Sequence, residues 1–279
     1  MAARTGRDLG AAIGVGLPLV ILIVLALVFW PPGLILLLVL ATSLGCIEVH
    51  DALKRVGMTS ARTPLVIGNI AIIGGTYAVE YFDKYTDIPW QFILLGCLGG
   101  TVMLVLVWRM FGGAEGYARD TAASLFTIAY IPLLASFVGL ILAMPNGEML
   151  LTAVFLCVCG SDTGGYAVGA TLGKHQLAPN ISPKKTWEGL IGSVLLSGAV
   201  GIVMAVCFMG WPWWYGELLS LVAVVAGTCG DLVESLIKRD VGIKDMSSVL
   251  PGHGGAMDRL DSVLFAAPAC WFIFCLPIL

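Results

Sequence analysis

Residues 215–237 read YGELLSLVAVVAGTCGDLVESLI, a run in which apolar side chains predominate. At about 1.5 Å per residue, this run is long enough to cross the roughly 30 Å hydrocarbon core of a bilayer as one α-helix. Of its three carboxylates, Glu217 lies near the start and Asp231 and Glu234 lie toward the C-terminal end. The run therefore predicts a membrane-spanning helix that carries charge near its ends.

Eight further stretches have similar length and apolar character. They are residues 12–30, 33–49, 64–82, 90–108, 121–144, 148–170, 188–210 and 260–279. The first could be a signal peptide, but it ends at Trp30-Pro31-Pro32 without a small-residue cleavage site, so we expect a retained helix. The sequence thus predicts an all-α polytopic integral membrane protein with about nine transmembrane helices, built as a single membrane domain over residues 1–279.

Composition excludes the other broad classes of protein. Hydrophobic residues make up 58% of the 279 residues and charged residues 12%, against roughly 25% charged residues in soluble domains. The eight cysteines lie in or beside apolar runs without a C-x-x-C pair, which is typical of small hydrophobic residues rather than of disulfides or zinc ligands. A net charge of −3 without a basic tract predicts no nucleic-acid partner.

Lysine and arginine segregate to one side of the membrane when nine spans are assumed. All of them except Lys84 fall in the N-terminal segment or in the connections after the second, fourth, sixth and eighth spans. Because positive loops stay in the cytoplasm, we expect the N-terminus inside, the C-terminus outside and a cytoplasm-facing site in the plasma membrane. The long inner connections 173–187 and 238–259 predict scaffold helices in residues 1–150 and catalytic helices and loops in residues 151–279.

The polar residues that end the run 215–237 share one helix face. Asp231, Glu234, Ser235 and Lys238 are spaced i, i+3, i+4 and i+7, and Asp231 lies about 10 Å deeper than Lys238. A carboxylate at that depth needs a cation, a metal or a wet cavity beside it. The alternative is an internal salt bridge from Asp231 or Glu234 to Lys238.

A second polar group lies inside the predicted span 148–170. Residues 159–166 read CGSDTGGY, and a break of the helix around Asp162 would require protein or water to cover the backbone. We interpret this segment as the wall of a cavity. The alternative is a kinked helix in which serine and threonine hydroxyls bond to the backbone.

Two more carboxylates lie at the ends of predicted spans. Glu48, at an inner end, either borders a site or is solvated. Glu80, near an outer end, is expected at the wet interface.

The connection 173–187 reads GKHQLAPNISPKKTW, with three lysines and no acidic residue. Lys184, Lys185 and Thr186 stand directly before a predicted helix. Two amines, a hydroxyl and the N–H groups of a helix start suit a phosphate. Positive-inside topology alone is the alternative explanation for such a lysine pair.

Residues 251–262 read PGHGGAMDRLDS. The glycines around His253 permit a close approach of the backbone to a ligand. Asp258 and Asp261 are i and i+3 at the start of the last predicted helix, which suits Mg²⁺ with substrate phosphates as its remaining ligands. Capping of the helix by Asp258 is the alternative.

Carboxylates, lysines and glycine-rich turns on the cytoplasmic side indicate phosphoryl or nucleotidyl transfer between a soluble donor and a lipid acceptor. The sequence contains neither a Walker loop nor a G-x-G-x-x-G turn. An ion- or proton-coupled transporter that uses Asp162, Asp231 and Glu234 is one alternative, and an intramembrane aspartyl protease is another. A CDP-alcohol phosphotransferase would need a D-x-x-D-G-x-x-A-R run, which is absent.

The pattern of residues 235–239 (SLIKR), 244–245 (KD) and 251–262 resembles the signature of phosphatidate cytidylyltransferases. Residues 161–166 (SDTGGY), 181–189 (ISPKKTWEG) and 230–235 (GDLVES) resemble the same family, so the resemblance covers about residues 155–262. Gly165 departs slightly, since alanine is more frequent there in the family.

The resemblance implies that CTP and phosphatidic acid give CDP-diacylglycerol and pyrophosphate, for phospholipid synthesis, with Mg²⁺ and with or without a second cation such as K⁺. It also implies a homodimer in contact with membrane lipids. The residues then expected to act in catalysis are Asp231, Asp258, Asp261, His253 and Lys238, of which the three aspartates would bind the metal. Those expected to bind substrate are Ser161, Asp162, Ser182, Lys184, Lys185, Thr186, Glu188, Glu234, Ser235, Arg239 and Arg259.

Overall fold

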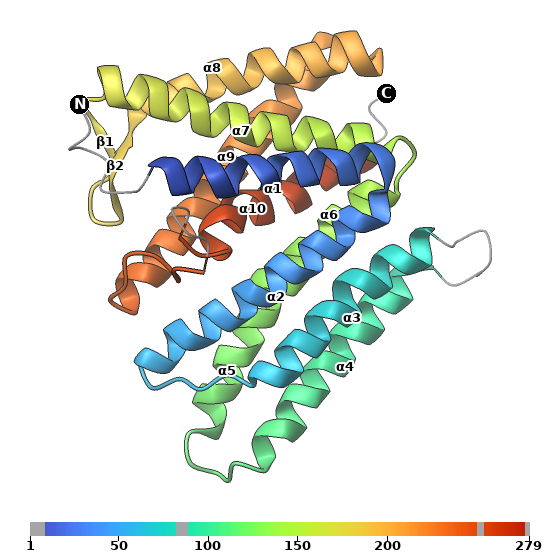
Figure 1. Ribbon diagram of the computed structural model, residues 1–279, viewed down its shortest axis with the longest axis vertical. Helices are drawn as coiled ribbons and strands as arrows, with labels where there is room; N and C mark the ends of the chain where they lie inside the picture. The colour runs from blue at the N-terminus through green and yellow to red at the C-terminus, as the bar shows by residue number, and fades with distance from the viewer. Residues whose placement is uncertain (1–8, 82–88, 250–253, 277–279) are drawn as a thin grey trace. The chain divides into compact units, whose positions relative to one another are not determined.

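The chain is predominantly helical in the computed structural model, which describes residues 9–81, 89–249 and 254–276 (Figure 1). Over these residues, a helix coincides with each of the nine predicted stretches. The elements are α1 (Leu9–Phe29), α2 (Pro31–Arg55), α3 (Arg62–Tyr81), α4 (Trp90–Met110), α5 (Tyr117–Ile128), η2 (Ala129–Leu133), α6 (Leu134–Ala143), α7 (Gly147–Leu172), β1 (Gln176–Ala178), β2 (Ser182–Thr186), α8 (Trp187–Val203), η3 (Met204–Met209), α9 (Trp213–Asp240) and α10 (Met257–Cys275).

Six helical segments of the described residues are long and apolar enough to cross a membrane. They are Pro31–Arg55, Trp90–Met110, Tyr117–Ala143, Gly147–Leu172, Trp187–Met209 and Trp213–Asp240. The chain is therefore an all-α membrane protein. The finer prediction of nine spans additionally requires α1, α3 and α10 to cross.

Two of these segments contain a π-helical turn. The predicted span 121–144 is one rod formed by α5, η2 and α6, and η2 contains Pro132. Proline has no N–H to donate within the helix, and a wider turn accommodates that loss. η3, which contains no proline, ends the α8 rod before Gly210, which has a φ of 68°.

The helices pack into two compact units. The first comprises residues 1–139 and 241–260, and the second comprises residues 140–240 and 261–279. The sequence divides the chain into scaffold and catalytic parts near residue 150. That division concerns function and stays a prediction. By packing, the chain divides near residue 140, and the connection before α10 belongs to the first unit.

The first unit has an apolar core to which α3, α4 and α5 contribute. Leu65, Ile72 and Val105 are fully buried in it, and α3 and α4 lie side by side (Figure 1). A buried polar contact joins α3 to α2, because Asn69 Nδ2 donates to Thr42 Oγ1 at 2.9 Å. Such contacts between helices are favoured where lipid offers no alternative partner.

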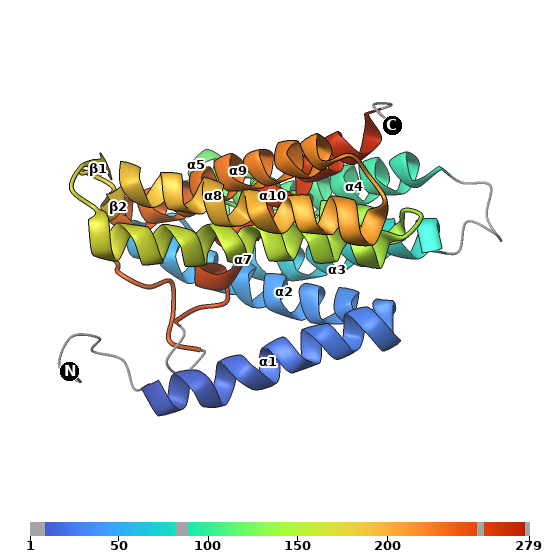
Figure 2. The same cartoon turned by 90° about the horizontal axis from the view of Figure 1, so that it is seen from above.

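The second unit is held by close contact between α7 and α8, which run side by side (Figure 2). A Cβ atom at Gly164 would collide with the carbonyl oxygen of Gly192, so the two backbones touch there. Ser193 Oγ donates to the Ser161 carbonyl at 2.7 Å from the same face. Small residues at a helix interface permit this approach in membranes.

Two local expectations are wrong. The predicted break around Asp162 does not occur, since α7 is continuous from Gly147 to Leu172. Residues 173–187, expected as a loop, form the antiparallel hairpin β1–β2, in which Gln176 pairs with Thr186. The glycines near Asp162 serve packing against α8 rather than interruption of the helix.

The contact between α7 and α8 predicts a stability effect. We expect Gly164→Val to lower the thermal unfolding temperature of the detergent-purified protein clearly, because overpacking a close contact costs about 1–3 kcal/mol or more. Gly99→Val is the matched control, since a Cβ at Gly99 in α4 would meet no atom within 4 Å. Equal melting temperatures for the two variants would contradict the contact.

Candidate active site

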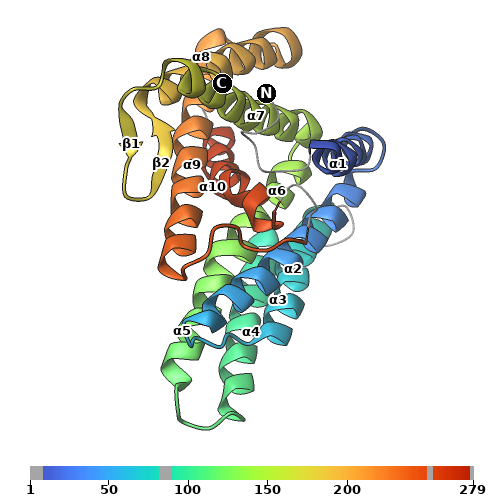
Figure 3. The ribbon, with the colours of Figure 1, turned by 60° about the vertical axis from the view of Figure 1, so that its left-hand side comes forward.

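A cavity of about 360 Å³ lies in the second unit, among α7, the β1–β2 hairpin, α8 and α9. Figure 3 shows these four elements together. The cavity is lined by Ser161, Asp162, Gly165, Tyr166, Leu177, Ser182, Lys184, Lys185, Thr186, Gly189, Leu190, Ser193, Thr228 and Asp231. The fold thus brings together seven residues predicted from three separate motifs, and the interpretation of residues 159–166 as a cavity wall is confirmed.

A short ion pair closes one side of this cavity. Lys185 Nζ, carried by β2, lies 2.7 Å from Asp231 Oδ2 on α9, and these side chains are 24% and 35% exposed. Ser235 Oγ donates to Asp231 Oδ1 at 3.4 Å. Because a solvent-accessible ion pair contributes only about 0–1 kcal/mol, Lys185 can exchange the carboxylate for an anionic ligand at little cost.

A second ion pair lies one turn further along α9. Glu234 is 1% exposed, and its Oε2 lies 2.6 Å from Lys238 Nζ. The internal salt bridge considered from the sequence therefore forms at Glu234, while Asp231 takes its cation from the hairpin. Asp261 of α10 lies close to Glu234 and within electrostatic range of Asp231 and Lys238.

Glycines of α9 allow α10 to approach this cluster. A Cβ atom at Gly230 would collide with the carbonyl oxygen of Asp261, and one at Gly227 would lie 3.5 Å from Ser262 Cβ. Asp261 Oδ1 also accepts the N–H of Ser262 at 2.8 Å, which fixes its side chain. This approach of the two helix backbones brings Asp261 within electrostatic range of Asp231.

Two neighbouring carboxylates fit one requirement of Mg²⁺. Among the described residues, no three His, Cys, Asp or Glu side chains converge as a preformed metal site. Mg²⁺ is usually bound by one or two carboxylates together with waters and substrate phosphates. Asp231 and Asp261 therefore match a cation that binds together with a nucleotide better than one held by the protein alone.

Glu188 ties the two ends of the hairpin together. Its Oε2 accepts the backbone N–H groups of Lys174 and His175 at 3.1 and 3.2 Å, and its Oε1 lies 2.6 Å from His175 Nδ1. The backbone N–H of Trp187 donates to the His175 carbonyl at 2.9 Å. Glu188, predicted to bind substrate, is placed at the base of the hairpin rather than in the cavity lining.

Thr186 ends the hairpin and begins α8. Its Oγ1 accepts the N–H of Gly189 at 3.0 Å, which is the N-cap contact of the helix. Thr186 also lines the cavity, so the start of α8 faces this space, as its position before the predicted helix indicates. Arg239 is exposed and its Nε donates to the Ile181 carbonyl at 3.4 Å, outside the cavity lining.

The first turn of α10 belongs to the first unit. Asp258 Oδ2 accepts the backbone N–H groups of Gly255 and Met246 at 2.7 and 3.1 Å. Both donors precede Met257, where α10 begins, so these contacts tie the incoming segment to Asp258 rather than cap the helix. Arg259 is exposed. His253, predicted to act on the leaving group, lies outside the described residues.

Sequence reasoning assigned no individual role to three hydroxyl-bearing residues of the cavity lining. Tyr166 lies one turn after Asp162 on α7, Thr228 lies one turn before Asp231 on α9, and Ser193 faces the cavity from α8. The i±3 and i±4 spacing to a predicted site residue would have found the first two. Nothing in the sequence around Ser193 distinguishes it from other serines of an apolar helix.

Comparison with known families identifies the family of the chain. The family model described as "Cytidylyltransferase family" matches residues 11–276. The chain belongs to the cytidylyltransferase family. The match includes α2 to α10. The helices before residue 155, where the sequence shows no motif of the family, therefore also belong to the region that the family model covers.

Relatives of this cytidylyltransferase extend over almost its whole length. Proteins named phosphatidate cytidylyltransferase are 38% identical in Mycobacterium tuberculosis, over 98% of this chain and 84% of the relative, and 39% identical in Mycobacterium leprae, over 96% and 88%. One from Synechocystis is 29% identical over 99% of this chain and 98% of the relative. The predicted resemblance to this family is confirmed.

The contacts of Glu188 at the base of the hairpin predict that a variant without them is cut faster by a protease. We expect Glu188→Ala to raise severalfold the rate at which trypsin cuts after Lys184 and Lys185, because the contacts to Lys174 and His175 are lost together. The measurement is limited proteolysis of the detergent-purified protein with mass spectrometry of the fragments.

Glu115→Ala is the matched control, since this exposed acid belongs to the turn between α4 and α5. An unchanged cleavage rate in Glu188→Ala would show that the hairpin does not depend on this carboxylate.

Proposed function

We propose that this membrane protein transfers the cytidylyl group of CTP to phosphatidic acid, giving CDP-diacylglycerol and pyrophosphate. The observation that carries the proposal is the cavity in which Lys184, Lys185 and Asp231 converge from two motifs of the family. The relatives that match over most of the chain carry the name of this activity. A transporter would have no evident use for a lysine-bearing hairpin at its carboxylates.

The reaction joins two anions, so charge neutralisation is its main requirement. A phosphate oxygen of phosphatidic acid attacks the α-phosphorus of CTP, and the bond from this phosphorus to the oxygen that bridges to the β-phosphate breaks. Pyrophosphate leaves with that electron pair. The phosphatidate phosphate is already ionised at neutral pH, so a strong general base is not required.

The residues of the cavity suit these tasks. Lys185 can leave Asp231 for a phosphate oxygen, and Lys184 adds a second cation on the same strand. The hydroxyls of Ser161 and Ser182 and the start of α8 at Thr186 offer further hydrogen-bond donors to phosphate. We propose that these groups bind the triphosphate of CTP and the phosphate of the lipid.

We propose that Asp231 and Asp261 bind Mg²⁺ together with the nucleotide phosphates. A contribution of Asp258 is proposed on the family resemblance alone. A bound Mg²⁺ would withdraw charge from the phosphates as a Lewis acid. Lys238 holds the neighbouring Glu234 and balances the acidic cluster. A second cation such as K⁺ is part of the same proposal and rests on the family resemblance.

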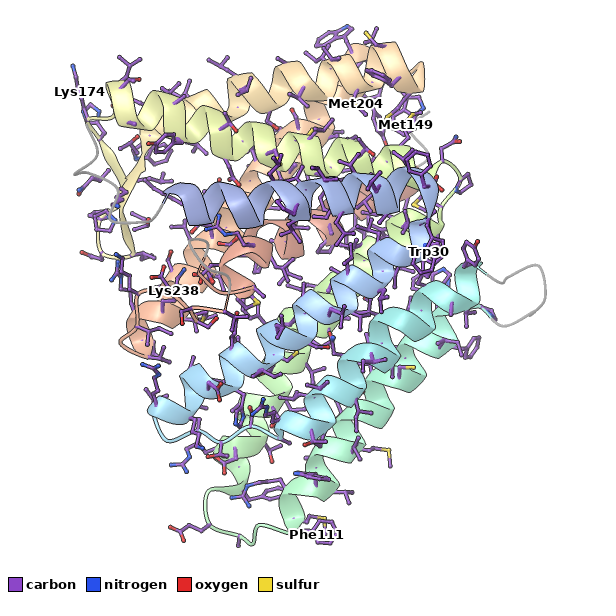
Figure 4. The ribbon with its side chains drawn as sticks, viewed as in Figure 1. Trp30, Phe111, Met149, Lys174, Met204 and Lys238 are labelled. Atoms are coloured by element: carbon purple, nitrogen blue, oxygen red, sulfur yellow. The ribbon has the colours of Figure 1, made fainter. Side chains whose placement is uncertain are left out.

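We propose nine spans with the N-terminus and the cavity on the cytoplasmic side of the plasma membrane. Positive-inside segregation supports this orientation. Within the second unit, Lys174 and Lys238 lie at the hairpin end, whereas Met149 and Met204 lie toward the opposite end (Figure 4). A homodimer is also proposed, on the resemblance alone.

The activity is tested with radiolabelled CTP and phosphatidic acid, and we expect lipid-soluble label that requires Mg²⁺ and is lost in EDTA. Lys185→Met should lower kcat/KM about 100-fold, because a positioned charge on a reacting phosphate is worth that order of magnitude. Asp231→Asn should lower it similarly. Lys174→Met, at the exposed base of the hairpin, is the matched control and should keep its activity.

Absence of lipid-soluble label in folded wild-type protein would overturn the proposed function. If lipid-soluble label still forms in EDTA, the protein carries out the transfer but does not require Mg²⁺ for it.

The proposed orientation predicts the location of reporter fusions. Alkaline phosphatase, which is active only outside the cytoplasm, should be active when fused after Leu279 and inactive when fused after Gln176. Comparable fusion protein levels are the control. The opposite pattern would place the hairpin outside and contradict a cytoplasmic CTP site.

A further inference from the structure

Glu48 is a buried carboxylate of the first unit that the proposed chemistry does not use. It lies in α2, just after the apolar part of that helix, and is 3% exposed. Burial of a charged group is costly unless donors surround it. The sequence leaves open whether Glu48 borders a site or is solvated, and the structure shows that it is not solvated.

The donors to Glu48 come from the segment that begins α10. Oε1 accepts Ser247 Oγ at 2.6 Å and the backbone N–H of Ala256 at 2.9 Å, and Oε2 accepts the backbone N–H of Met257 at 2.9 Å. The first N–H groups of a helix have no partner within the helix, and its N-terminus attracts negative charge. Glu48 therefore caps α10 from a helix about 200 positions earlier in the chain.

Asp258 binds the adjoining part of the same turn. Its Oδ2 accepts the N–H of Gly255 at 2.7 Å, so two carboxylates together hold the three consecutive N–H groups of residues 255–257. A Cβ atom at Gly255 would lie 2.6 Å from Glu48 Oε2, which leaves room for glycine only. The position of Asp258 is thereby coupled to that of Glu48 through a single peptide segment.

The apolar side of the turn is fixed by the same helix. Met257 is fully buried, and its Sδ would lie 3.0 Å from a Cβ atom at Gly45, one turn before Glu48 on α2. α2 thus contacts the start of α10 with a small residue and a charged one. The first turn of α10 is therefore held through its backbone by Glu48 and through the side chain of Met257 by the contact at Gly45.

We propose that Glu48 is a positioning residue for Asp258, the first carboxylate of α10. It fixes the first turn of the helix, and so the direction in which Asp258 is presented. This inference rests on the proposed function, which assigns Asp258 a part in binding Mg²⁺.

The test compares Glu48→Gln with Glu48→Asp in the full-length protein. Glu48→Gln replaces one acceptor oxygen by a donor that faces the backbone N–H groups. We expect amide hydrogen exchange in residues 255–260 to become about tenfold faster, and the Mg²⁺ concentration for half-maximal activity to rise about tenfold, because a hydrogen bond to a charged group contributes on that scale. The KM for phosphatidic acid should change less than about twofold under saturating Mg²⁺, and Glu48→Asp should restore part of both effects.

Asp51→Asn is the matched control, since it removes an exposed carboxylate one turn later on α2. Gly255→Ala is a second route to the same contact and should reproduce the faster exchange, even where Glu48→Gln folds poorly. Unchanged exchange at residues 255–260 in both Glu48→Gln and Gly255→Ala would overturn the proposal. So would faster exchange without any change in the Mg²⁺ requirement.

The two readouts separate this inference from the proposed function. Hydrogen exchange reports whether Glu48 stabilises the first turn of α10, and it does so whether or not the protein makes CDP-diacylglycerol. A wild-type protein without Mg²⁺-dependent activity would reject the proposed function. A Mg²⁺-dependent wild type whose Mg²⁺ requirement is unchanged by Glu48→Gln would reject only the positioning role.

Discussion

A charged side chain in an apolar helix must find its partner within the protein, because the surrounding lipid offers neither water nor counter-ions. Much of the second unit follows from this requirement. α9 can carry Asp231 because the hairpin supplies Lys185, and it can bury Glu234 because Lys238 lies one turn away. The two lysines differ in position. Lys238 lies on the same helix as Glu234, whereas Lys185 lies on β2 and remains accessible to a ligand.

Close contact between backbones is the second condition for this arrangement. Gly164 and Gly192 bring α7 against α8, and Gly230 brings α9 against α10 at Asp261. Larger side chains at these positions would separate the helices and move their polar groups apart. Glycine in these helices therefore sets the distance between functional groups as well as the packing.

The connecting segments are anchored by carboxylates that bind backbone N–H groups. Glu188 holds the base of the hairpin through Lys174 and His175, and Glu48 holds the start of α10 through Ala256 and Met257. Most of these contacts go to the backbone, and the side chains of His175 and Ser247 add one contact each. In the hairpin this leaves Lys184 and Lys185 available to the cavity.

The sequence by itself determined the helical membrane class, the approximate extent of each helix, the family and seven residues of the cavity, because hydropathy is set locally and the motifs are long. It could not determine that Asp231 pairs with Lys185 rather than Lys238, since both lysines satisfy the charge and only the path of the hairpin decides between them. It also could not show that the glycines beside Asp162 pack against α8 instead of breaking α7. The role of Glu48 was equally beyond it, because the N–H groups that it binds lie about 200 positions away and are brought to it only by tertiary folding.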